Sequence, residues 1–270
     1  MADLDNDTAL AGADGTYRAA ITEDWRLLAP SGGFLSALAL RAAVTASQFK
    51  QPVTYYCHYL NPAEEGEVDL SVTSLRSSRR VESLRVDADQ KGRRVAEAMV
   101  WTVQPGDGVD HNTAERPDVE PPETYPPIET YVPDWPPFPF WRNFDYRPVP
   151  LPGQDPNVPG RAALRTWIRF RPTATFAADD LAAARLVILA DTFIFPAAQM
   201  AHARWPPPFW GVSLDLAVTI HDPGVEAEWL LVDAETPLAS GGVMGGWLRI
   251  WSEDGRLLAS SVQQMLQRAF

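Results

Sequence analysis

The chain has 270 residues, and 46% of them are hydrophobic, so it can bury one large core or two smaller ones. Its formal net charge of −12 argues against nucleic-acid binding and against an anionic membrane surface, although a local basic patch could still hold a small anion. The single cysteine, Cys57, excludes an internal disulfide and is typical of a reducing compartment. The N-terminus is acidic and does not resemble a secretion signal, and no apolar run looks long enough to span a bilayer. We therefore expect a cytoplasmic protein without membrane or nucleic-acid partners.

The first half of the chain predicts a strand, a buried helix and four further strands. Residues 1–15 are small and acidic, and we expect them to be frayed. A short strand is predicted over 17–21. A helix is predicted over 34–44, where most residues are Ala or Leu and Ser31 precedes the helix as a plausible N-cap. The four strands after the helix are predicted over 53–60, 67–76, 82–88 and 94–103.

The middle of the chain differs in composition from both ends. Residues 104–160 hold 15 of the 25 prolines, a density that excludes regular helix and interior strand. The same segment is too rich in aromatic residues for a solvated coil. We expect an extended segment that packs over the surface it covers. The chain is accordingly divided into an N-terminal half (1–104), a Pro-rich linker (105–159) and a C-terminal half (160–270).

The second half again predicts a strand, a buried helix and four strands. The first strand covers 161–172, and its outward arginines are interpreted as a solvated stripe, with contact to an anionic ligand as the alternative. The helix is expected near 182–200. The closing strands are predicted over 214–220, 229–235, 243–251 and 257–266.

One carboxylate, Asp191, lies inside the apolar run 184–196. A charged carboxylate in apolar surroundings is costly unless it is paired or hydrogen-bonded, so this residue needs a reason. It could cap a helix that begins at Thr192. It could instead act as a general base or hold a water molecule in a dry pocket. The residues of this run leave both interpretations open.

The two halves also share landmarks beyond their order of elements. Asn61-Pro62 corresponds to Asp222-Pro223, and the hairpin glycine Gly92 corresponds to Gly255. The proline and the glycine lie 30 residues apart in the first half and 32 in the second. This pattern indicates a duplicated domain with a pseudo-twofold axis, like a symmetric dimer fused into one chain. Each half would bury its helix against one face of an antiparallel sheet.

Several motifs of the second half carry a family likeness: Ile220-His221-Asp222-Pro223, Glu228-Trp229-Leu230-Leu231, Ala239-Ser240-Gly241-Gly242 and the run from Asp254 to Gln263. With these motifs the chain resembles the double-hotdog acyl-CoA thioesterases, the type II or TesB-like group. The first half matches more loosely, through Gly32-Gly33, residues 59–62 and the Gly92 hairpin. The resemblance implies an α+β double hotdog, in which two fused halves each wrap an antiparallel sheet around a long helix. It also implies an acyl-CoA substrate, and hydrolysis without a cofactor or metal.

The resemblance also implies a site. In the family, an Asp, a Thr or Ser, and a Gln surround one water molecule, and these roles fall on Asp191, Ser213 and Gln263. Asp191 would orient or deprotonate the water, and the other two would hold it. Gln263 interrupts an apolar run, so it could also simply point outward. Amides at a helix start could hold the oxyanion. Gly32-Gly33 would allow close approach at the other helix, with plain tight packing as the alternative.

Two other functions stay open at this point. A hotdog frame could bind acyl-CoA or another hydrophobic ligand without turnover. A hotdog hydratase or dehydratase would use a histidine near an Asp, and His202 is the histidine nearest to Asp191 in sequence. Convergence of Asp191, Ser213 and Gln263 on one point would favour the hydrolase. Because a duplicated hotdog leaves sheet edges open, we also expect a homodimer or a larger homo-oligomer.

Overall fold

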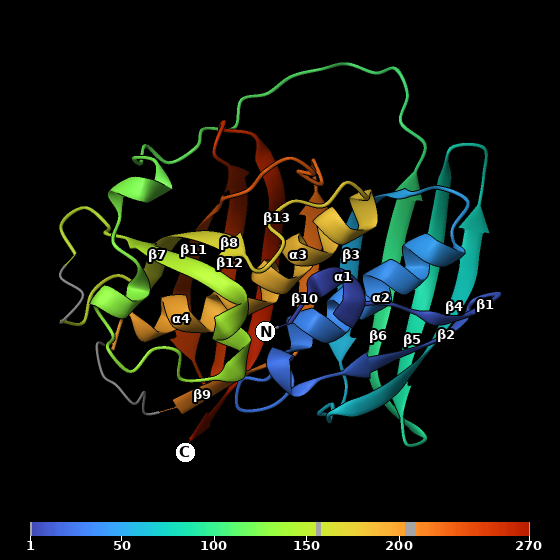
Figure 1. Ribbon diagram of the computed structural model, residues 1–270, viewed down its shortest axis with the longest axis horizontal. Helices are drawn as coiled ribbons and strands as arrows, with labels where there is room; N and C mark the ends of the chain where they lie inside the picture. Colours follow the sequence, from blue (N-terminus) through green and yellow to red (C-terminus); the bar gives the residue numbers. More distant parts are fainter. Residues whose placement is uncertain (1, 155–157, 203–208, 270) are drawn as a thin grey trace.

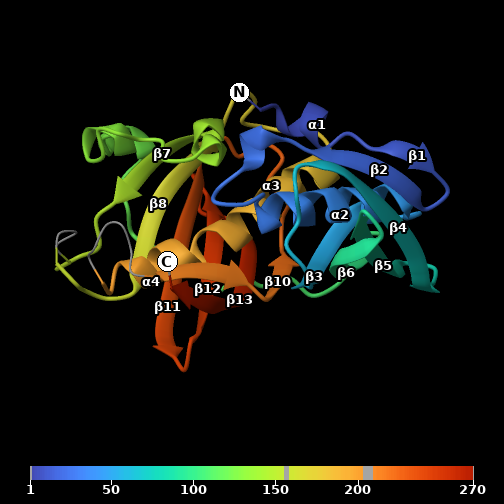
Figure 2. The ribbon, with the colours of Figure 1, turned by 90° about the horizontal axis from the view of Figure 1, so that it is seen from below.

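The computed structural model describes residues 2–154, 158–202 and 209–269, and these form one antiparallel sheet with two long helices against one of its faces (Figures 1 and 2). The strands of the N-terminal half are β1 (Ala11–Ala13), β2 (Thr16–Ile21), β3 (Gln51–Tyr59), β4 (Gly66–Ser77), β5 (Val81–Gln90) and β6 (Arg93–Val103). The later strands are β7 (Phe144–Val149), β8 (Ala163–Phe170), β9 (Phe209–Ser213), β10 (Asp215–Ile220), β11 (Leu230–Ser240), β12 (Val243–Ser252) and β13 (Leu257–Ala269). The helices are α1 (Leu4–Asp7), α2 (Gly32–Ala46), α3 (Asp179–Thr192) and α4 (Ile194–Gln199), with 3-10 turns at Glu23–Trp25, Pro122–Thr124, Ile128–Thr130 and Pro139–Asn143.

The two halves of the sheet have equivalent strand orders when each is read from its outer edge toward the centre: β2-β4-β5-β6-β3 corresponds to β8-β11-β12-β13-β10. The full order is β1-β2-β4-β5-β6-β3-β10-β13-β12-β11-β8-β7, with β9 beside β13. At its centre β3 pairs antiparallel with β10, and Tyr56 lies directly opposite Ala217. These two residues are 161 positions apart, as are the repeat landmarks Pro62 and Pro223. The pseudo-twofold axis therefore passes between Tyr56 and Ala217, and the predicted duplication with antiparallel strands is confirmed.

The two central helices, α2 and α3, approach each other at the backbone. Helix α2 starts with Ser31, whose Oγ accepts a hydrogen bond from the Phe34 amide at 3.3 Å. A Cβ on Gly33 would lie 2.8 Å from the carbonyl oxygen of Ile188, so only glycine fits at this crossing. Asp191 follows Ile188 by about one turn and therefore lies over the first turn of α2.

The expected helix near 182–200 is two helices joined at Phe193. Asp191 belongs to the last turn of α3, and Phe193, without a side-chain cap, precedes α4. The interpretation of Asp191 as an N-cap is therefore wrong. The expectation that no apolar stretch could span a bilayer is also wrong by length and hydropathy, because 179–199 satisfies both criteria. Since 94% of its apolar window is buried inside the protein, this stretch is a pair of core helices.

The first residues are ordered, contrary to the expectation of frayed ends. Leu4 is 2% exposed and belongs to the main core. The carboxylate of Asp7 accepts a hydrogen bond from Trp25 Nε1 at 2.9 Å, and Arg41 of α2 donates to Thr8 at 2.7 Å. The acidic composition alone could not predict these contacts, because the donors to Asp7 and Thr8 lie 18 and 33 residues away in sequence.

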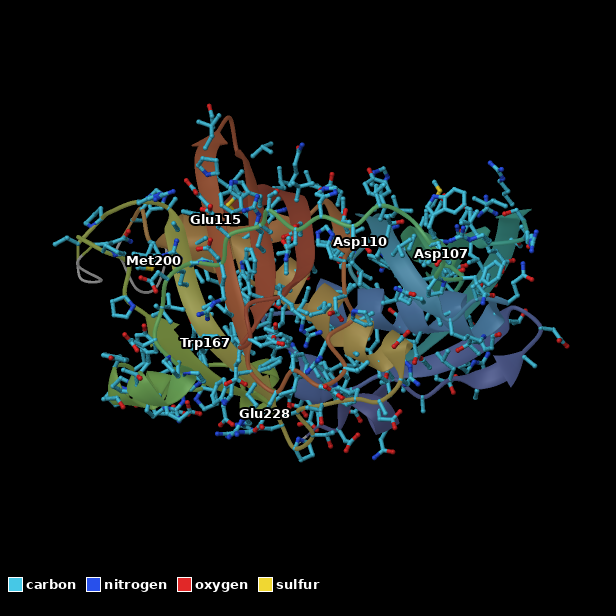
Figure 3. All side chains as sticks on the ribbon, turned by 90° about the horizontal axis from the view of Figure 1, so that it is seen from above. Asp107, Asp110, Glu115, Trp167, Met200 and Glu228 are labelled. Carbon is cyan, nitrogen blue, oxygen red and sulfur yellow. The ribbon has the colours of Figure 1, made fainter. Side chains whose placement is uncertain are left out.

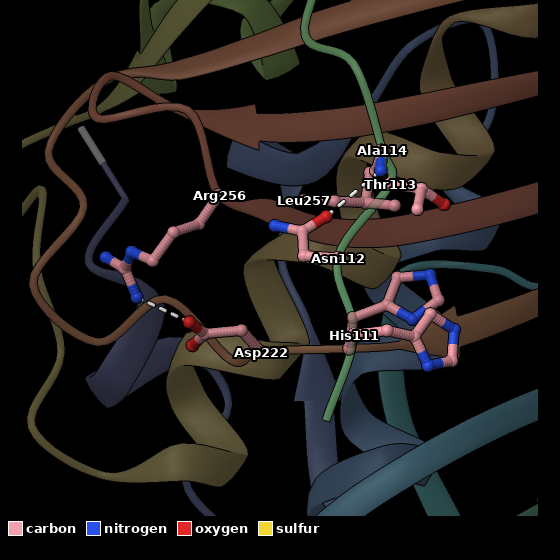
Figure 4. Close-up of a pocket in the computed structure, with 8 residues that line it drawn as sticks. His111, Asn112, Thr113, Ala114, Asp222, Arg256 and Leu257 are labelled. Carbon is pink, nitrogen blue, oxygen red and sulfur yellow. Dashed lines mark hydrogen bonds and ion pairs between the residues drawn. The ribbon is translucent and has the colours of Figure 1, made fainter. Parts of the chain in front are cut away.

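Part of the Pro-rich linker crosses one end of the molecule in extended form. We call residues 104–121 the strap; Asp107, Asp110 and Glu115 lie along it (Figure 3). Residues 111–114 of the strap, with Asp222, Arg256 and their neighbours, line a cavity of about 440 Å³ (Figure 4). The linker then forms β7 at the edge of the sheet, where Pro148 is tolerated. The boundaries at 104 and 160 stay a prediction.

Strand β8 and the residues just before it carry the arginines that were expected to form a solvated stripe. Arg165 pairs with Asp233 at 2.6 Å, and Arg169 pairs with Asp145 at 2.7 Å. Arg161 pairs with Glu235, also at 2.7 Å. The partners are carboxylates of neighbouring segments, so the stripe is already neutralised within the protein.

Candidate active site

Three side chains from three elements meet at the end of α3. Oδ1 of Asp191 accepts a hydrogen bond from Ser213 Oγ at 2.9 Å and a second from Gln263 Nε2. Nε2 of Gln263 also donates to Ser213 Oγ, at 3.1 Å. The structure thus brings together the three residues that the resemblance implied, and each contacts the other two.

The strands explain how Gln263 and Ser213 reach Asp191. Gln263 is in β13 and only 2% exposed, whereas its neighbour Val262 is 58% exposed on the outer face. The outward alternative for Gln263 is therefore wrong. Ser213 ends β9, opposite Met265 of β13, so it lies on the same buried face as Gln263. The pairing register of β9 with β13 therefore places the side chains of Ser213 and Gln263 on the face of the sheet that meets the end of α3.

The N-terminal half also contributes to this site, where the sequence pointed to the Gly32-Gly33 helix start but not to Tyr59. The Gly33 amide and the Tyr59 hydroxyl both lie close enough to the Asp191 carboxylate to lower its pKa. A Cβ on Gly32 would lie 3.0 Å from both Oδ2 of Asp191 and Cε1 of Tyr59, so the ring and the carboxylate flank the start of α2. A role of helix-start amides in holding an oxyanion stays a prediction; the Gly33 amide lies close enough to the Asp191 carboxylate to lower its pKa. The available signal was Gly32-Gly33 at the helix start and the alternation of Tyr55, Cys57 and Tyr59 along β3.

Burial controls the ionisation of these groups. It raises the pKa of Asp191, and the hydrogen bonds from Ser213, Gln263, Gly33 and Tyr59 oppose that rise without cancelling it. Burial also raises the pKa of Tyr59 well above its ordinary value, and the nearby Asp191 charge adds to the effect. Tyr59 therefore stays protonated and can donate a hydrogen bond at neutral pH. Burial raises the pKa of the neighbouring Cys57 thiol to about 12, so it is not a nucleophile.

One polar atom of the site has no hydrogen-bond partner among the described residues. Oε1 of Gln263 is buried and accepts no hydrogen bond from the described residues. The amide orientation is set by the other atoms, since Nε2 donates to both Asp191 and Ser213. A buried acceptor without a partner is costly, so this oxygen fits a small donor such as water.

The hydratase alternative loses support from this geometry. His202 lies beyond α4, exposed, with its ring against Phe209. Among the hydrogen bonds of the described residues, none joins a histidine to Asp191. The same part of the chain holds no group of three or more His, Cys, Asp or Glu side chains arranged to bind a metal.

Two family models match the chain. The C-terminal domain of acyl-CoA thioesterases matches residues 122–267, and the N-terminal domain of acyl-CoA thioesterases matches residues 21–103. The comparison with curated proteins gave no match.

Several solved structures share the fold over nearly their whole length. A conserved protein of unknown function with a hot dog fold from Alicyclobacillus acidocaldarius has 22% identity and a TM-score of 0.86, covering 99% of this chain and 98% of that one. The acyl-CoA thioesterase II TesB2 from Mycobacterium marinum has 21% identity and a TM-score of 0.81, covering 99% of each chain. The tesB protein of Mycobacterium avium subs paratuberculosis has 20% identity and a TM-score of 0.80, covering 98% and 97%. These likenesses confirm the double-hotdog fold, and with the family models they show that the chain belongs to the acyl-CoA thioesterase family and is a thioester hydrolase.

Proposed function

We propose that Asp191, Ser213 and Gln263 hold and activate a water molecule that hydrolyses an acyl-CoA thioester. The observation that carries this proposal is the arrangement around Asp191 Oδ1. This oxygen accepts from both Ser213 and Gln263, while the buried Oε1 of Gln263 has no partner among the described residues. A water molecule that donates to Oε1 and to the carboxylate would complete the network.

The proposed reaction begins with proton transfer to Asp191. The water oxygen attacks the thioester carbonyl carbon as its proton passes to the carboxylate. The tetrahedral intermediate then expels the CoA sulfur, the C–S bond breaks, and the proton held by Asp191 neutralises the thiolate. Burial supports this role, because a raised pKa makes Asp191 a stronger base than an exposed carboxylate. Gln263 and Ser213 fix the water and the carboxylate, which removes their freedom to reorient.

The test of this proposal is Asp191→Asn. Asparagine keeps the size of the side chain but cannot accept the proton, so we expect turnover of acyl-CoA to fall about 100- to 10,000-fold. Stability should hold or rise, because a buried charge has been removed. The matched control is Asp215→Asn. The Asp215 carboxylate is close in sequence to Ser213, but it accepts a hydrogen bond from the backbone amide of Gln264, at 2.8 Å, and not from Ser213 or Gln263. Steady-state hydrolysis and a denaturant melt are measured for each variant.

Wild-type turnover in the Asn variant would remove the proposed roles of all three residues. Equal losses in both variants would point to a general electrostatic effect instead. A panel of acyl-CoA substrates of increasing chain length, assayed with the wild-type protein, would identify the acyl group. The non-catalytic binding alternative predicts saturable binding without turnover for every member of that panel.

A further inference from the structure

Tyr59 connects the N-terminal half to the proposed base. Its hydroxyl lies 2.7 Å from Ser36 Oγ, on the inner side of the first turns of α2. A Cβ on Gly32 would lie 3.0 Å from both Cε1 of the Tyr59 ring and Oδ2 of Asp191, so the ring and this oxygen flank the start of α2, and the Tyr59 hydroxyl is close enough to lower the pKa of Asp191. Ser213 and Gln263 both donate to the other oxygen, Oδ1. Oδ1 is therefore held by the C-terminal half, and Oδ2 faces the start of α2 and the Tyr59 ring of the N-terminal half.

The direction of these hydrogen bonds follows from the ionisation of the groups. A phenol has one proton to donate, and an ionised carboxylate is its strongest available acceptor. If Tyr59 donates to Asp191, then Ser36 must supply the hydrogen between the two hydroxyls. This arrangement gives Tyr59 a donor and an acceptor and strengthens its bond to the carboxylate.

We propose that Tyr59 is a positioning residue for the hydrolysis: its hydroxyl holds Oδ2 of Asp191 and stabilises the ionised carboxylate, so that the base works at lower pH. The inference rests on the proposed role of Asp191 as the base. Tyr59 does not contact the reacting atoms, and it acts only through the orientation and ionisation of Asp191.

The test is Tyr59→Phe, which keeps the ring and removes the hydroxyl. We expect the acidic limb of the kcat/KM profile to move to higher pH, because the ionised form of Asp191 has lost a donor. At the acidic end kcat/KM should fall about 10- to 150-fold, as expected for one hydrogen bond to a charged group, and less on the plateau. Ser36→Ala should move the limb in the same direction but less, and the two changes together should be less than additive.

The matched control is Tyr55→Phe. Tyr55 lies four residues earlier on the same face of β3, it is 1% exposed, and it is not among the groups that lower the pKa of Asp191 by hydrogen bonding. Removing this hydroxyl should leave the acidic limb in place. A purely structural role of Tyr59 would lower the melting temperature and the plateau rate without moving the limb, and that result would overturn the proposal.

A second readout separates this inference from the proposed function. The pKa of Asp191 can be followed by carbon-13 NMR of the side-chain carboxyl in the wild type and in Tyr59→Phe, without any turnover. A rise in the variant shows that Tyr59 controls the ionisation of Asp191, whatever the activity of Asp191→Asn, so a failure of the proposed function can be told apart from a failure of this contact. An unchanged carboxyl titration would refute the role of Tyr59 even if Asp191 is the base.

Discussion

At the scale of single residues, Asp191 carries a charge where burial disfavours it. Its pKa is raised, so the carboxylate takes up a proton at higher pH than an exposed aspartate does. If the ionised form is the base, kcat/KM should fall as pH decreases through this raised pKa. We expect the acidic limb to lie above the ordinary aspartate value of about 3.9. The measurement is a pH–rate profile from pH 4 to 8, and a flat profile down to pH 4 would contradict the assignment.

The raised pKa of Asp191 also determines how its contribution to the stability of the fold changes with pH. The folded pKa of Asp191 lies above the unfolded one, so in the interval between them the folded protein binds more protons. The contribution of this group to stability therefore grows as pH falls through the folded pKa, and it is complete below the unfolded value. Asp191 thus costs stability at neutral pH, which is the reason that Asp191→Asn should not destabilise the protein.

The residues of the site differ in how far the sequence could predict them. Asp191, Ser213 and Gln263 could be named through the resemblance, and Asp191 stood out unaided as a carboxylate in an apolar run. The direction of Gln263 could not be predicted, because local hydrophobicity favours Val262 as the buried residue and the structure has the reverse. Tyr59 had only a weak signal, its place on the inward face of β3, because its proximity to Asp191 spans 132 positions of chain.

At the scale of elements, the crossing of α2 and α3 sets the position of Asp191. Gly33→Ala would place a methyl group 2.8 Å from the Ile188 carbonyl oxygen and 3.1 Å from Cβ of Asp191. The helices must then separate, and overpacking of this kind typically costs about 1–3 kcal/mol. We expect kcat to fall more than 10-fold, because a displacement of about 1 Å can cost 100-fold in rate.

The control for this change is Gly245→Ala in β12. A Cβ there would meet its nearest atoms at 3.8 Å, an ordinary contact, and the backbone needs no glycine. Hydrolysis rates and denaturant melts of both variants decide the question. Equal activity of Gly33→Ala and the wild type would mean that the crossing does not position the base.

Most elements could be predicted because their apolar periodicity is strong. The strands and helices of both halves appear within a few residues of the expected ranges, with the α3–α4 break as the main difference. The missed elements are short or irregular: α1, β1, β7 and β9. Strand β7 lies in the Pro-rich linker, where composition excludes an interior strand but allows an edge strand. Strand β9 is five residues long and pairs only through β13, so no local pattern distinguishes it.

At the scale of the whole molecule, duplication of the fold did not duplicate the site. Val262 pairs with Ala217 and Met99 pairs with Tyr56, so Val262 and Met99 are equivalent about the pseudo-twofold axis. One residue further along β13, Gln263 has Val100 as its counterpart, which is fully buried and apolar. The partner position therefore lacks the amide that the proposed mechanism needs.

The homo-oligomer remains a prediction, and the structure changes where we expect the contact. The edge strand β1 has three residues and the edge strand β7 contains Pro148, so both edges pair poorly. The outer face instead carries a row of directly paired residues across five central strands: Met99, Tyr56, Ala217, Val262 and Trp247. Its four large members are each at least 36% exposed. Because the row crosses the pseudo-twofold axis on the outer face, a second copy can present the same row to it.

We expect a homodimer by light scattering at micromolar concentration, and Val262→Lys should shift it toward monomer. The control is Leu238→Lys, which changes an exposed residue of β11 outside the row. A monomeric wild-type protein would end this prediction.

The cytoplasmic location is likewise a prediction, which fractionation of cells would test.

The strap makes the two halves separable without cutting the sheet. Residues 107–114 are exposed, and the hydrogen bond described within them runs from the Ala114 amide to the Asn112 side chain. The pairing of β3 with β10 and the packing of α2 on α3 do not depend on this segment. A protease site inserted after Gly108 should therefore give a nicked protein that migrates as one complex on size exclusion and keeps its hydrolysis rate. Each fragment alone should be inactive, because Gly33 and Tyr59 reside on one piece and Asp191 on the other, so that mixing the refolded fragments restores activity in the manner of a split enzyme.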